Sequence, residues 1–91
     1  MVLNVYSIFD NKARCFSRPF FAVNAEVATR SFGQVANDLS TEIGRHPTDF
    51  TLFCIGSFDD ELGTLWPLGQ NENLGLATMY KSPEVANAPQ S

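Results

Sequence analysis

Residues 12–21 combine the two kinds of side chain that bind single-stranded nucleic acid. The segment KARCFSRPFF contains three cations, three phenylalanines and no acidic residue. Cations pair with phosphates along a strand, while aromatic rings stack on unpaired bases, and stacking contributes ~1–3 kcal/mol per base without requiring a high net charge. The sequence therefore predicts a nucleic-acid-binding segment, with one further candidate in the preceding strand. The candidate residues are Lys12, Arg14, Phe16, Arg18 and Phe21, with Tyr6 as the addition.

The other residues that could catalyse a reaction or bind a metal do not form a recognisable site. His46 is the single histidine, and the acidic residues near it do not follow a zinc or calcium spacing. A serine or cysteine nucleophile needs a base and a group that orients the base. A single histidine in so short a chain gives little support for such a triad. The chain has neither a Walker loop nor a GxGxxG motif. We therefore expect a protein that is not an enzyme and that uses no metal or other cofactor.

Length and composition indicate one small soluble domain. The chain has 91 residues, of which 44% are hydrophobic and eight are phenylalanine, enough for a modest core. Its net charge of −4 argues against a protein that coats duplex DNA by charge alone. Cys15 and Cys54 are too few for a disulfide framework, so we expect free thiols. With no signal peptide and no apolar run near the ~20 residues of a membrane span, we expect a cytoplasmic protein without a membrane partner.

The first half of the chain predicts a hairpin followed by a helix. Residues 2–9 are rich in the β-branched and aromatic side chains typical of a strand. Residues 10–12 supply turn chemistry, so that 13–16 can return antiparallel. Asn24 is a good N-cap, and apolar residues then recur at helical spacing until the helix stops near 37–40.

Residues 50–58, FTLFCIGSF, predict the central strand. Alternation along a strand divides its apolar side chains between two faces. One face would hold Leu52, Cys54 and Phe58, and the other would hold Phe53 and Ile55. Because both faces are apolar, the pattern indicates a central strand or a face used in an interface.

The remaining segments complete the predicted architecture. Residues 41–49 are polar and indicate a loop, 59–63 form a hairpin turn, and a returning strand begins at 64 and ends at Pro67. We therefore predict an α+β fold, in which two hairpins make a four-stranded antiparallel sheet with one helix packed on one face. This single domain spans residues 1–69, and residues 70–91 are predicted to be a flexible C-terminal tail.

Two adjacent phenylalanines link this fold to the binding segment. Pro19 cannot donate to a strand ladder and should end the strand before them. Neighbouring residues in an extended segment point in opposite directions, so we predict Phe20 in the core and Phe21 displayed. One helix covers only one sheet face, and an apolar face left open usually marks a partner surface. We therefore expect a homodimer or a higher oligomer.

Several short stretches, taken in order, resemble the small nonstructural protein of gokushoviruses, the Microviridae subfamily of single-stranded DNA phages. They are VYSIFD, the PFF before the helix, the ND at its end, HPTDF before the central strand and IGSFDDELG at the turn. The resemblance implies a DNA-binding bacteriophage protein that is made in the host bacterial cytoplasm and absent from the mature capsid. It implies a role in viral DNA replication or in the switch to DNA packaging, and it supplies no catalytic residues.

Two functions follow from these observations. The leading hypothesis is a non-enzymatic phage protein that binds single-stranded DNA in viral DNA replication or in the switch to packaging. The alternative is a protein–protein adaptor that docks on the replication initiator or the procapsid without contacting DNA. The net negative charge and the doubly apolar strand at 50–58 favour the alternative.

Overall fold

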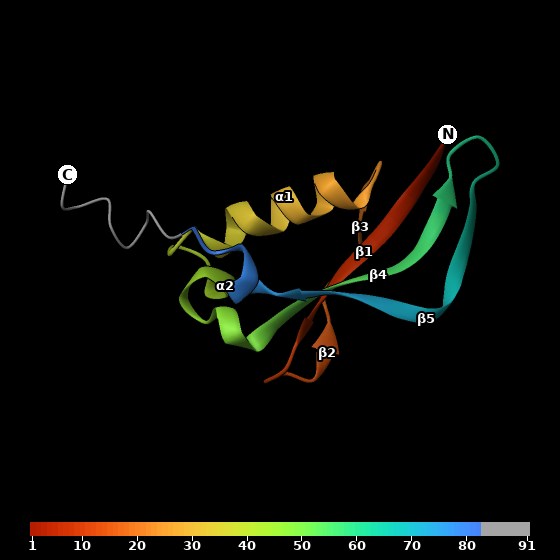
Figure 1. Cartoon of the computed structure of the whole chain (residues 1–91). Helices are drawn as coiled ribbons and strands as arrows, with labels where there is room; N and C mark the ends of the chain where they lie inside the picture. The colour runs from red at the N-terminus through yellow and green to blue at the C-terminus, as the bar shows by residue number, and fades with distance from the viewer. Residues whose placement is uncertain (83–91) are drawn as a thin grey trace.

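The chain folds as a twisted antiparallel sheet with one long helix lying along one side of it (Figure 1). The computed structural model describes residues 1–82. Its elements are β1 (Val2–Asp10), β2 (Cys15–Phe16), β3 (Phe20–Ala22), α1 (Ala25–Ala36), α2 (Glu42–Arg45), the 3-10 helix η1 (Pro47–Asp49), β4 (Phe50–Asp59), β5 (Thr64–Leu76) and the 3-10 helix η2 (Ala77–Tyr80). The predicted α+β fold, an antiparallel sheet with one main helix, is confirmed.

Strand β1 is the centre of the sheet. One of its edges pairs with β2 and β3 in turn, and its other edge pairs with β4, which pairs with β5. Every pairing is antiparallel. The sheet contains five strands instead of the predicted four, because the residues after Pro19 return to β1 and form β3.

Helix α1 begins and ends within the predicted limits. The Asn24 side chain accepts a hydrogen bond of 2.9 Å from the Val27 amide and caps the first turn. Ala28, Phe32 and Ala36 recur every four residues, so they lie on one face, and all three are buried against the sheet. This face of α1 and the sheet face beneath it enclose the hydrophobic core.

Strand β4 carries a β-bulge at Ile55, which has no partner residue on β1. An extra residue in a strand reverses the alternation of faces beyond it. Cys54, before the bulge, therefore faces α1, whereas Phe58, after it, lies on the opposite face and contacts the ring of Phe21 at 5.3 Å. The prediction that Leu52, Cys54 and Phe58 share one face was wrong for Phe58.

Residues 41–49, predicted as a loop, form two short helices instead. The Thr41 hydroxyl accepts a hydrogen bond of 3.0 Å from the Gly44 amide and so caps α2. A Cβ at Gly44 would lie 2.0 Å from the Asp38 carbonyl oxygen, so only glycine fits this packed corner. None of the described helices is long and apolar enough to cross a membrane.

The folded region extends beyond the predicted domain end at residue 69. Pairing with β4 stops at Pro67 but resumes at Glu72, and η2 then packs against α1. Ala77 is fully buried, and the Asn37 side chain donates a hydrogen bond of 2.9 Å to the Tyr80 carbonyl. Residues 70–82 therefore belong to the folded domain and not to the predicted tail, and the rest of that tail, 83–91, lies outside the described residues.

Candidate nucleic-acid interface

The sheet face that α1 does not cover, here called the open face, carries an aromatic cluster. The ring of Phe16 lies 4.9 Å from that of Phe9 and 5.5 Å from that of Phe53, measured between ring centroids. Strand pairing explains the cluster, because residues directly opposite each other share a face and Phe9 is paired with Phe16. Phe16 is 45% exposed, so its ring is both supported by its neighbours and open to solvent.

Phe21 lies on the same open face but apart from this cluster. It pairs with Val5, whereas Phe20 pairs with Tyr6 on the side of α1. Phe20 stacks on the Tyr6 ring and packs against the core, while Phe21 is 47% exposed. The predicted division between a core Phe20 and a displayed Phe21 is confirmed.

The segment between β2 and β3 separates the two aromatic positions and carries Arg18. Ser17 is tied to β1, since its amide donates to the Ile8 carbonyl at 2.8 Å and its carbonyl accepts from the Ser7 hydroxyl at 2.8 Å. These bonds hold the backbone beside Arg18 while its side chain remains exposed. Along the chain, an exposed cation thus lies between the two aromatic residues of the open face.

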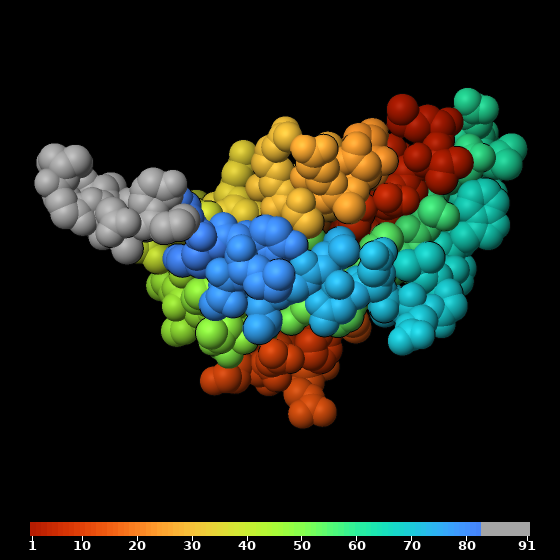
Figure 2. Space-filling view, in the orientation of Figure 1, coloured from red at the N-terminus to blue at the C-terminus, as the bar shows by residue number. Residues whose placement is uncertain are grey.

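The turn between β1 and β2, residues 10–14, is here called the basic turn. The Asp10 carboxylate accepts hydrogen bonds from the amides of Lys12 at 2.9 Å and Ala13 at 3.2 Å, and the Asp10 carbonyl accepts from the Arg14 amide at 2.7 Å. Arg14 has a φ of 63°, in the left-handed region. This turn projects from the body of the molecule, as the red and orange segment in Figures 1 and 2 shows.

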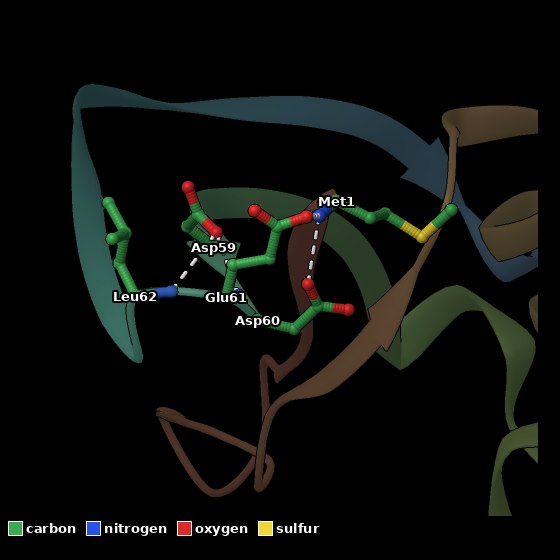
Figure 3. Close-up of polar contacts among 5 residues, drawn as sticks. All are labelled: Met1, Asp59, Asp60, Glu61 and Leu62. Carbon is green, nitrogen blue, oxygen red and sulfur yellow. Dashed lines mark hydrogen bonds and ion pairs between the residues drawn. The ribbon is translucent and has the colours of Figure 1, made fainter.

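The turn between β4 and β5, residues 59–63, has the same hydrogen-bond pattern and is here called the acidic turn. The Asp59 carboxylate accepts from the amides of Glu61 at 2.9 Å and Leu62 at 3.3 Å (Figure 3), and the Asp59 carbonyl accepts from the Gly63 amide at 2.8 Å. Gly63 has a φ of 66°. Arg14 therefore occupies the position in the basic turn that Gly63 occupies in the acidic turn. For a residue with a side chain, this left-handed backbone conformation costs ~1–2 kcal/mol of stability.

Three cations have no partner among the residues that the structure describes. Arg30 pairs with Glu26 at 3.9 Å, Arg45 donates to a backbone carbonyl at 3.2 Å, and Lys81 does so at 3.4 Å. Within residues 1–82, the other three Lys and Arg side chains make no hydrogen bond or ion pair. These three are Lys12, Arg14 and Arg18, the cations predicted from the sequence.

The acidic turn lies at the opposite end of β1 from the basic turn. The Met1 ammonium binds the Asp60 carboxylate at 2.9 Å and the Glu61 carboxylate at 3.3 Å (Figure 3). The hydrogen bond to Asp60 is the main cause of the raised pKa of this amine. Nine residues of strand at ~3.3 Å each place the two turns about 30 Å apart. The open face therefore runs from positive to negative charge.

The structure brings together most of the predicted site but excludes Tyr6. Lys12, Arg14, Phe16 and Arg18 belong to one continuous segment at the basic end, and Phe21 lies further along the face. Tyr6 is only 1% exposed and faces α1, because it alternates with Val5 along β1. Burial raises the pKa of its phenol, and the Asn4 amide donates to its hydroxyl at 3.1 Å. The prediction that Tyr6 contacts nucleic acid was wrong.

Three aromatic residues of the open face were missed as site residues. Phe9 and Phe53 support Phe16, and Phe58 supports Phe21. Alternation along 50–58 predicts that Phe53 and Leu52 lie on different faces of the strand. This pattern was the available indication that Phe53 belongs to the open face. Phe58 could not be found in this way, because the bulge reverses its face.

The sequence predictions also concerned the cysteines and the groups that could bind a metal. Cys15 is an exposed free thiol and Cys54 a buried one, which confirms the prediction of free thiols. Burial raises the pKa of the Cys54 thiol. Within residues 1–82, no three His, Cys, Asp or Glu side chains are grouped so that they could hold a metal ion.

Comparison with known proteins agrees with the resemblance seen in the sequence. The model of the family described as Phage ORF5 protein matches residues 3–81. Protein ORF5 of Chlamydia phage 1, a gokushovirus, is 32% identical over 83 residues, which cover 87% of this chain and 82% of that protein. No solved structure matches the chain. The chain therefore belongs to the Phage ORF5 protein family, a family of small gokushovirus proteins.

Proposed function

We propose that this protein binds single-stranded DNA at the basic end of its open face and acts in viral DNA replication or in the switch to packaging. One observation carries the proposal. The three cations that have no partner within residues 1–82, Lys12, Arg14 and Arg18, surround the half-exposed Phe16 in the sequence. A phosphate can approach them without breaking an ion pair of the described residues.

The support around Phe16 favours stacking on a base. Phe9 and Phe53 hold its ring from two sides, so little side-chain freedom is lost when a base packs against the exposed part. Bases inside a duplex are already stacked, whereas the bases of a single strand are free to pack on an aromatic ring. We therefore expect a preference for single strands over duplexes.

The number of cations sets the strength and the salt dependence of binding. Each phosphate neutralised on a single strand contributes about −0.7 to the slope of log affinity against log salt, so three contacts give about −2. Such a shallow slope corresponds to weak binding that depends on stacking as well as on charge. Fluorescence anisotropy with labelled oligonucleotides over a salt series measures this slope directly.

Two variants and one control test which residues carry the binding. Phe16→Ala should weaken binding by ~1–3 kcal/mol, and Arg18→Ala should reduce the salt slope by about 0.7. Arg30→Ala is the matched control, because it removes the same charge from α1 on the covered side of the sheet. Absence of binding at low salt, a preference for duplex DNA, or an equal effect of the Arg30 variant would contradict the proposal.

A protein–protein adaptor is the second candidate function. The acidic turn favours it, since Asp59, Asp60 and Glu61 would repel DNA but could attract a basic protein such as a phage replication or capsid protein. A pull-down from phage-infected lysate treated with nuclease separates the two functions. Partners that survive nuclease favour the adaptor, and partners that are lost favour binding to DNA.

A further inference from the structure

The open face contains an apolar groove of about 260 Å³ beside Phe21, near the acidic turn. Its walls include Pro19, Phe21, Leu65, Trp66 and Pro67. Solvent reaches the groove, because Phe21, Leu65 and Trp66 are 47%, 62% and 45% exposed. This volume lies below the roughly 300–1,000 Å³ of pockets that hold drug-sized ligands, so it suits one flat ring system.

We propose that this groove receives a second base of the same DNA strand that is bound at Phe16. The inference rests on the proposed function and adds a path for the strand. Phe16 pairs with Phe9 and Phe21 pairs with Val5, four residues apart on β1, so the two aromatic positions are separated by about 13 Å. Arg18 lies between them in the chain and can bind the intervening phosphate.

The spacing limits the length of DNA that the face accepts. Stacked bases are about 3.4 Å apart and bases of an extended strand are further apart, so about 13 Å corresponds to at most roughly four nucleotide steps. Beyond the groove lies the acidic turn, where Asp59, Asp60 and Glu61 repel phosphates. The groove is therefore the last position on the path, and the footprint is about four to five nucleotides.

Trp66 provides a built-in reporter at the edge of the groove. It is the only tryptophan in the chain and one of the residues that line the groove, although its pairing with Ser57 turns its side chain toward the other face of the sheet. Unlabelled oligothymidylates of increasing length are titrated while Trp66 fluorescence is recorded, and labelled ones of the same lengths are followed by anisotropy. Short oligonucleotides should bind at Phe16 without changing Trp66 fluorescence. Quenching should appear when the length reaches about four nucleotides, together with a gain in affinity of about 5- to 150-fold.

Two substitutions in the groove and one outside it complete the test. Phe21→Ala should remove the quenching and the gain with length but leave the affinity of the shortest oligonucleotides unchanged. Leu65→Ala should act in the same direction without a risk to folding, since Leu65 is largely exposed. Leu62→Ala is the matched control, because Leu62 is 70% exposed in the acidic turn and is not part of the groove wall.

The outcomes separate this inference from the proposed function. Anisotropy that shows binding at every length without any change in Trp66 fluorescence would overturn the second base position and leave DNA binding intact. Quenching that the Phe21 and Leu65 variants leave unchanged would also overturn it, as would quenching by an apolar peptide but not by DNA. Absence of binding at every length would overturn the proposed function itself.

Discussion

Replacing Arg14 with glycine should stabilise the fold and weaken DNA binding at the same time. Arg14 has a left-handed backbone with a φ of 63°, and its side chain makes no hydrogen bond or ion pair within residues 1–82. The acidic turn, which has the same hydrogen-bond pattern, holds Gly63 at the equivalent position. A side chain at this position therefore costs stability, and we infer that its charge is retained for binding.

The magnitude follows from two opposing contributions. A left-handed conformation costs a residue with a side chain ~1–2 kcal/mol, and glycine removes that cost. Glycine loses more backbone freedom on folding, which costs ~0.5–1 kcal/mol. We therefore expect Arg14→Gly to raise the free energy of unfolding by about 0.5–1 kcal/mol, equivalent to about 2–8 °C in the melting temperature of a domain this small.

Lys12→Gly is the matched control, because it removes the same charge from the same turn. Among the described non-glycine residues only Arg14 has a positive φ, so glycine at position 12 relieves no strain and should lower stability by ~0.5–1 kcal/mol. Thermal melts should thus move in opposite directions, while both variants reduce the salt slope of oligonucleotide binding by about 0.7. A lower melting temperature for Arg14→Gly would refute the strain argument, and an unchanged slope would refute the phosphate contact.

Three further predictions concern the fold itself. Gly56→Ala should strongly lower the denaturant midpoint, because a Cβ would lie 2.4 Å from a β5 carbonyl oxygen, whereas Gly69→Ala has open space and should change it little. Phe20→Ala should lower the free energy of unfolding by about 3 kcal/mol and Phe21→Ala by about 1 kcal/mol, and equal losses in denaturant titrations would contradict their opposite faces. Stability should fall as pH rises above about 9, since burial raises the pKa of Cys54 above its ordinary 9.0 and only the unfolded thiol then loses its proton. In thermal melts above pH 9, the melting temperature of Cys54→Ala should fall less with pH than that of the unchanged protein.

The sequence predicts those elements whose local signals agree with their tertiary surroundings. Asn24 caps α1 as expected, because the cap depends on the residue itself and its next few neighbours. The opposite faces of Phe20 and Phe21 follow from strand geometry alone. Most of the candidate site was predictable for the same reason, since Lys12 to Arg18 is one continuous segment.

The errors arise where pairing between distant segments decides the outcome. Nothing local marks Ile55 as a bulge, because β4 has apolar residues on both faces and either register would bury some of them. The pairing of β5 with β4 resumes at Glu72 after an interruption, in a polar tract that lacks strand periodicity. Tyr6 and Val5 are both buried although they face opposite ways, so alternation along β1 did not indicate that Tyr6 faces α1.

The separation of the two turns explains how a chain with a net charge of −4 could bind an anion. Charges are screened over about 8 Å at physiological ionic strength, whereas the acidic turn lies about 30 Å from the basic turn. A phosphate near Lys12 and Arg14 would therefore experience mainly the charges of that turn, which are these two cations and the Asp10 carboxylate, and little of the acidic turn. At about 0.01 M salt the screening length approaches 30 Å, and repulsion by the acidic turn would then offset part of the attraction. The net charge should thus flatten the salt slope at low salt without abolishing binding, while the local arrangement of charge governs binding under physiological conditions.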